Sequence, residues 1–152
     1  AALGGAGLLH GARLARWAGH RTMSDRLVLI LHLAYAFIPA GFLLAALSAV
    51  DLVVPSAGIH AWTGGAVGSM TIAVMTRATL GHTGQALSAS IATQLVYASL
   101  VIAALARVCA ARGPTHSIPL LMIAGVAWAG AFLGFALVYG PLLCGGRKFQ
   151  KA

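Results

Sequence analysis

Residues 27–50 contain no Lys, Arg, Asp or Glu and are apolar almost throughout. A helix over this stretch exceeds the ~20 residues that cross the hydrocarbon core of a bilayer. Only 8% of the 152 residues are charged and 60% are hydrophobic, which is more apolar surface than a soluble domain of this length can bury. The sequence therefore predicts an integral membrane protein of the all-α class.

Further apolar segments follow, and together they predict a polytopic transmembrane helix bundle. We expect four full spans, at about residues 27–50, 59–80, 88–106 and 118–143. Ser24 and Asp25 are typical of a helix start ahead of the first span, and Pro39 with Gly41 predicts a kink within it.

Residues 1–12 are largely apolar, with no positive charge ahead of them. A secretory signal places its positive charge before the apolar run, so this segment indicates the end of a preceding helix. We expect residues 1–152 to form a single transmembrane region that is the C-terminal fragment of a longer protein.

The ten Lys and Arg residues outnumber the two acidic residues and lie at the ends of the apolar segments. With alternating spans, all but Arg107 and Arg112 fall on the side that carries residues 13–26, Arg77 and the C-terminal tail. The positive-inside rule predicts that this side, with the C-terminus, is cytoplasmic. The net charge of +8 then reflects topology and attraction to the lipid bilayer, and we expect no nucleic-acid binding.

Residues 60–84 are far more polar than the other segments. At helical spacing, one row of residues is expected to share a face: His60, Gly64, Gly68, Thr71, Met75, Thr79 and His82. Lipid gives no reason to align such residues, whereas a buried helix contact or a cofactor cleft does. Gly64 and Gly68 form GxxxG, which favours close helix packing, with a flat macrocycle against the backbone as the alternative.

Three histidines are candidate ligands. His32 lies within the predicted hydrocarbon region, where it is either a metal or haem ligand or a hydrogen-bonded core residue. His60 and His82 lie about 33 Å apart along one helix and cannot ligate one metal together. We therefore expect pairs at matching depth, His32 with His82 or His60 with His116, unless the terminal histidines only cap the helix or reach the interface.

Met75 and Met70 offer thioethers that suit copper(I), although methionines in a span are usually core residues. Arg77 either extends to interfacial water or pairs with a carboxylate such as a haem propionate. Cys109 and Cys144 fall near opposite membrane faces, so we expect no disulfide between them.

The run HAWTGGAVGSMTIAVMTRATLGHTG, residues 60–84, closely resembles the signature of the NnrS family, HA-x-T-x-GA-x-G-x-M-x-x-AVMTR-x-TLGHTG. LHLAYAFIPAG at residues 31–41 is similar to the family's preceding span, and YGP at residues 139–141 is similar to its ending. The resemblance implies a longer multi-pass protein of the bacterial inner membrane, whose N-terminal spans are missing here. It also implies haem and copper as cofactors and a role in nitric oxide metabolism, denitrification and resistance to nitrosative stress.

Residue by residue, the resemblance makes His32, His60 and His82 candidates for haem and metal binding, with Arg77 for haem and Met75 for metal. It leaves open whether the protein is an enzyme. Two other interpretations stay open: a transporter or channel segment whose polar helix lines a pathway, with Pro39 and Gly41 as its gate, and a structural membrane bundle without a cofactor.

Overall fold

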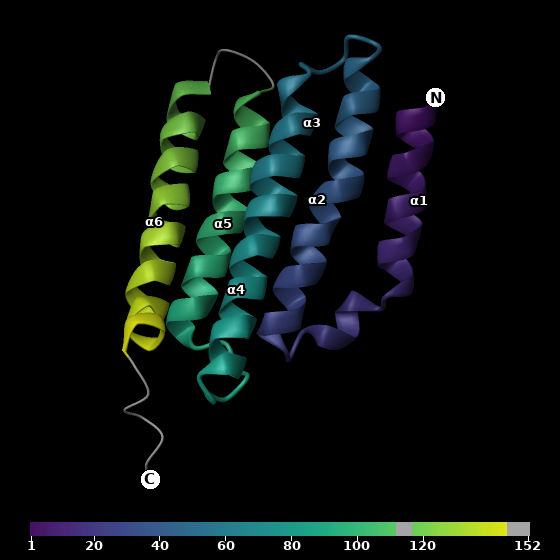
Figure 1. Cartoon of the computed structure of the whole chain (residues 1–152). Helices are drawn as coiled ribbons and strands as arrows, with labels where there is room; N and C mark the ends of the chain where they lie inside the picture. The colour runs from purple at the N-terminus through teal and green to yellow at the C-terminus, as the bar shows by residue number, and fades with distance from the viewer. Residues whose placement is uncertain (112–116, 146–152) are drawn as a thin grey trace.

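The computed structural model describes residues 1–111 and 117–145, and the long segments of this part are all helical. The helices stand side by side in alternating directions, with α3, η2 and α4 following one another in a single rod (Figure 1). In chain order they are α1 (Ala2–Arg16), η1 (Gly19–Thr22), α2 (Arg26–Ser48), α3 (Ser56–His60), η2 (Ala61–Gly68), α4 (Ser69–His82), α5 (Ile91–Ala110) and α6 (Ser117–Cys144). The predicted all-α class is confirmed for the described residues.

The prediction of four full spans is wrong in number. By length and composition, three helices of the described part can cross a membrane: α2, α5 and α6. The expected second span is helical over residues 56–82, but it is divided, because η2 is a π-helix whose hydrogen bonds join residues five apart. Neither α3 nor α4 is long enough to cross alone. The glycines in η2 favour the regular α-helix only weakly.

Helix α2 begins where the sequence predicted. The Asp25 carboxylate accepts hydrogen bonds from the backbone N–H groups of Leu27 (3.0 Å) and Val28 (3.3 Å), which caps the helix. The helix continues through Pro39 to Ser48. Beside the proline, the Trp62 indole Nε1–H donates to the carbonyl of Ile38 at 3.2 Å, which joins η2 to α2.

The rod formed by α3, η2 and α4, called the polar rod here, approaches α2 closely because glycines line the contact. The Trp62 indole lies against Gly41, and the Phe37 ring lies against Gly65. A Cβ on Gly58 would stand 2.9 Å from the carbonyl oxygen of Gly41. Close backbone approach of this kind is how helices gain packing energy in lipid, where no hydrophobic effect separates helix from solvent.

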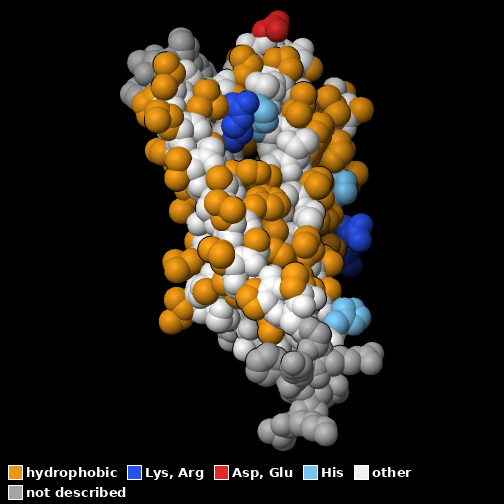
Figure 2. Space-filling view, turned by 60° about the vertical axis from the view of Figure 1, so that its left-hand side comes forward, with side chains coloured by type: hydrophobic (Ala, Val, Ile, Leu, Met, Phe, Trp, Pro, Cys, Tyr) orange, Lys and Arg blue, Asp and Glu red, His pale blue; other side chains and the backbone are white. Residues whose placement is uncertain are grey.

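A larger core joins α2, α4, α5 and α6. It consists of Leu27, Ile30, Ile72, Ala73, Leu80, Val96, Tyr97, Leu100, Ala131, Phe135 and Tyr139. Large apolar side chains also cover the outside of the bundle, as Figure 2 shows for one face. That exposed apolar surface suits contact with lipid.

The two ends of the bundle differ in charge. The end of α1, η1, the start of α2 and the end of α4 meet at one end of the bundle (Figure 1). It is called the basic end here, because these segments carry Arg13, Arg16, Arg21, Arg26 and Arg77. Arg107, near the end of α5, lies toward the opposite end. This arrangement agrees with the distribution of charge expected from the sequence.

The glycine contact between α3 and α2 yields a stability prediction. Gly58→Ala forces a Cβ against the Gly41 backbone, which cannot rotate away, and we expect it to cost about 1–3 kcal/mol. Gly81→Ala on α4 is the matched control, because nothing lies within 4 Å of its Cβ position and alanine favours the helix. Thermal unfolding of the full-length protein should show a lower midpoint for the first variant only, and equal midpoints would contradict the packing described.

Candidate functional site

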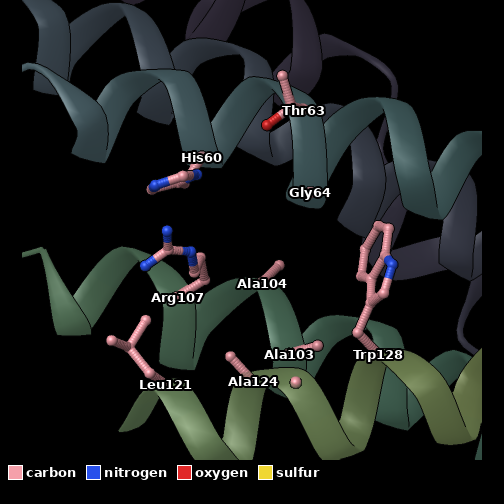
Figure 3. A pocket seen from close by; sticks show the side chains of 10 residues that line it. His60, Thr63, Gly64, Ala103, Ala104, Arg107, Leu121, Ala124 and Trp128 are labelled. Atoms are coloured by element: carbon pink, nitrogen blue, oxygen red, sulfur yellow. The ribbon is translucent and has the colours of Figure 1, made fainter. Parts of the chain in front are cut away.

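A pocket of about 380 Å³ opens between the polar rod, α5 and α6, toward the end opposite the basic end. His60, the last residue of α3, points into it from one side, and Arg107 of α5 points toward His60 from the other (Figure 3). The remaining lining residues are Thr63, Gly64, Ala103, Ala104, Leu121, Ala124, Gly125 and Trp128. The size is that of a small-molecule site.

The pocket exists because its walls are small. Glycine and alanine from three helices leave the space that larger side chains would fill, and Ala103 and Ala104 are themselves almost fully buried. The Trp128 indole closes the inner side, where it lies against Gly68 and contacts the Phe132 ring with centroids 4.9 Å apart. The GxxxG pair predicted from the sequence is therefore a packing surface at Gly68 and a pocket wall at Gly64.

Arg107 carries a permanent positive charge into mostly apolar surroundings. The chain has only two acidic residues: Asp25 caps α2, and Asp51 is exposed in the turn after that helix. Within the described residues Arg107 has no carboxylate partner, and it faces an imidazole. A ligand with an anionic group and an apolar body would complement this pocket.

His32 lies elsewhere, half-buried on α2 beside the connection from α1. Its Nδ1 donates to the carbonyl of Val28 at 3.1 Å, so in the neutral ring the Nε2 lone pair is left for another partner. The ring meets Trp17 edge-on, with centroids 6.1 Å apart, and packs over Gly19. These recorded contacts are all with residues 17–28, and the pairing of His32 with His82 stays a prediction.

A histidine that carried no local signal in the sequence is also built into this side. His10 Nδ1 lies 2.8 Å from the Tyr35 hydroxyl, and the ring stacks on Phe42 with centroids 5.4 Å apart. Tyr35 in turn packs against Trp17 at 4.6 Å. The overlooked signal is spacing: the two ring residues on each helix are seven positions apart, which places each pair on one helix face.

The prediction of a single polar face along residues 60–82 is wrong. His60, Gly64 and Gly68 do face α5 and α6, but Thr71, Met75 and His82 are exposed, whereas Thr79 is buried. The buried face of α4 consists of Ser69, Ile72, Ala73, Thr76, Thr79 and Leu80. The buried residues keep helical spacing through η2, and packing against the neighbouring helices selects a face one residue away from the expected one, as it already does at Ala61 and Gly65.

The other predicted site residues are placed as follows. Arg77, like Met75 and His82, is exposed on α4. His116, the expected partner of His60, lies outside the described residues, and Arg107 faces His60 in the part that is described.

Cys109 and Cys144 are free thiols, as expected. No group of three or more His, Cys, Asp or Glu side chains that could hold a metal ion occurs within residues 1–111 and 117–145.

Apolar helices of spanning length around a pocket with one imidazole and one guanidinium define an integral membrane protein with a candidate ligand site. A family model described as NnrS protein matches residues 1–147, and the chain belongs to the NnrS family. No curated protein and no solved structure matches the chain.

Proposed function

We propose that the chain is part of a haem- and copper-containing protein of the bacterial inner membrane that acts in the response to nitric oxide and nitrosative stress. Its membership of the NnrS family, a nitric oxide-related family of membrane proteins, supports this setting. The observation that carries the proposal furthest is the pocket in which His60 and Arg107 face each other.

The chemistry of the residues that line this pocket is compatible with haem. Imidazole is the usual protein ligand of haem iron, and His60 presents its ring to the pocket. A guanidinium pairs well with a carboxylate, so Arg107 would hold a haem propionate. The small side chains of Ala103 and Ala124 would leave room for a macrocycle, and Trp128 would bound its apolar side. When bound, haem would supply an iron centre to which nitric oxide can bind.

Copper fits the described residues less well, because they contain no cluster of three metal-binding side chains. His32 keeps a ring nitrogen available, and Met75 and His82 are exposed on α4, where their side chains are accessible to a further ligand. Arg77 is exposed on the same helix and would reach interfacial water or an anionic group. His32, Met75 and His82 remain our candidates for metal binding and Arg77 for haem binding, and no step is assigned to copper.

The transport alternative finds less support. It places a pathway along Thr71 and Thr79, but one of these is exposed and the other buried, so they do not line one channel. Gly41, the proposed gate, is covered by the Trp62 indole.

Variants of the pocket test the haem proposal in the purified full-length protein. We expect a haem absorbance band that is lost or shifted in His60→Ala, because the imidazole is the proposed iron ligand. Arg107→Leu should weaken haem binding roughly tenfold, the effect typical of removing a group that supports a metal site. Arg107→Lys should recover part of that loss, since it restores the charge but not the paired geometry.

His20→Ala serves as the control, because His20 is exposed in η1 and far from the pocket in the chain. It should leave the haem spectrum unchanged. Absence of haem and of copper above background in the wild-type protein would overturn the proposal. A wild-type spectrum in His60→Ala would instead reject this histidine as the ligand.

The two cysteines test the orientation in the membrane. Cys109 and Cys144 are exposed near opposite ends of the bundle. With the basic end cytoplasmic, a membrane-impermeant maleimide added outside spheroplasts should label Cys109 in the Cys144→Ser variant. It should label Cys144 in the Cys109→Ser variant only after the membrane is opened, and the reverse pattern would contradict the proposed orientation.

A further inference from the structure

A chain of hydroxyl groups enters the bundle from the basic end, between α5 and α6. Ser90, the exposed N-cap of α5, has its Oγ 3.0 Å from Thr93 Oγ1. Thr93 Oγ1 is in turn 2.6 Å from the Tyr139 hydroxyl of α6. Thr93 and Tyr139 are only 1% and 2% exposed, so these two hydrogen bonds connect the surface with the core.

Beyond this point lie buried hydroxyls that have no partner. The hydroxyl oxygens of Tyr97 and Thr76 are buried and lie close to each other without the geometry of a good hydrogen bond, and neither has another partner within the described part of the chain. Tyr97 is one turn further along α5 than Thr93, and its hydroxyl lies next to Thr76 and near Tyr139. Ser69, two turns from Thr76 along α4, is equally buried and unpaired.

Unpaired hydroxyls are costly in an apolar interior. Buried polar groups are nearly always hydrogen-bonded to protein or to ordered water, and each exception calls for an explanation. Tyr97 on α5 and Thr76 on α4 lie next to each other, and packing alone does not require their hydroxyls, because phenylalanine and valine would fill the same space without a penalty. Their position indicates a polar ligand inside the bundle.

A polar pocket of about 460 Å³ lies at the start of this chain of hydroxyls. Its lining includes Asp25 and Arg26 from the start of α2, with Ala89 and Gln94 on either side of Ser90 in the sequence. Water at the basic end therefore has access to the first hydroxyl. The path needs no ligand larger than water to reach Ser90.

We propose that the inner end of this path, at Tyr97 and Thr76, binds water that exchanges with the basic end, so that protons reach the interior of the bundle along Ser90, Thr93 and Tyr139. A hydroxyl both donates and accepts a hydrogen bond. A proton moves along such a chain when each oxygen accepts one from its neighbour and releases its own to the next, which leaves every side chain unchanged. The use of these protons in nitric oxide chemistry rests on the proposed function, but the water site does not.

Radiolytic hydroxyl-radical footprinting of the full-length protein tests the site, because radicals made from bound water oxidise the side chains next to it. Tyr97 is expected to be labelled although it is 5% exposed. Thr76→Val removes one hydroxyl that holds the water, and labelling of Tyr97 should fall to that of Phe37, a buried ring packed against Gly65. Thr71→Val is the matched control on the exposed face of α4 and should leave the labelling of Tyr97 unchanged.

Thermal unfolding of the same variants gives a second readout. If the Thr76 hydroxyl has no hydrogen-bond partner, the valine variant removes a buried unpaired polar group and has a higher unfolding midpoint. If it binds water, the midpoint stays the same or falls. An unlabelled Tyr97 in the wild type, or a raised midpoint in Thr76→Val, would overturn the inference, and neither result depends on haem or copper content.

Discussion

Arg107 faces an imidazole, and the described chain gives it no carboxylate partner. A charged group among apolar helices is expensive, and it persists where it pairs with another group or serves a ligand. Because the chain has so few acidic residues, an anion held by this guanidinium would have to come from outside the described part. His60 on the opposite wall turns a general anion site into one that can also ligate a metal.

The pocket depends on the irregular geometry of the polar rod. Glycines allow α3 and η2 to lie against α2 on one side and against Trp128 on the other, and a regular helix of larger residues could not make both contacts. Packing against the neighbouring helices buries Thr76 in the core and leaves Met75 facing outward. π-helical turns inside helices are frequent at functional sites, and here one directly follows His60.

Much of the architecture was predictable because it follows from local rules. Apolar segments longer than a bilayer specified the all-α membrane class, and Asp25 marked the start of α2 because its carboxylate satisfies free N–H groups. The opposite positions of Cys109 and Cys144 followed from counting helices between them. The family was predictable from the motif in residues 60–84, which hydropathy does not explain.

The remaining features depend on tertiary contacts that spacing alone does not encode. A regular helix was assumed for residues 59–80, so the number of spans was wrong, and helical spacing gave the period of the buried face of α4 but not which residues pack inward. Arg107 was treated only as a charge at the outer end, since nothing local connects it with a histidine forty-seven positions earlier in the chain. The hydrogen bond between His10 and Tyr35 was missed because spacing places ring residues on one face of each helix but does not show that the two faces meet.

The basic end and the opposite end of the bundle thus carry different chemistry. Hydroxyls lead inward from Ser90, whereas the imidazole and guanidinium lie toward the other end.

A high-resolution structure of the full-length protein in a lipid nanodisc tests the central claim most directly. We expect density in the pocket that contacts both the His60 ring and the Arg107 guanidinium. Acyl chains filling the pocket, with both side chains turned out to headgroup water, would contradict it.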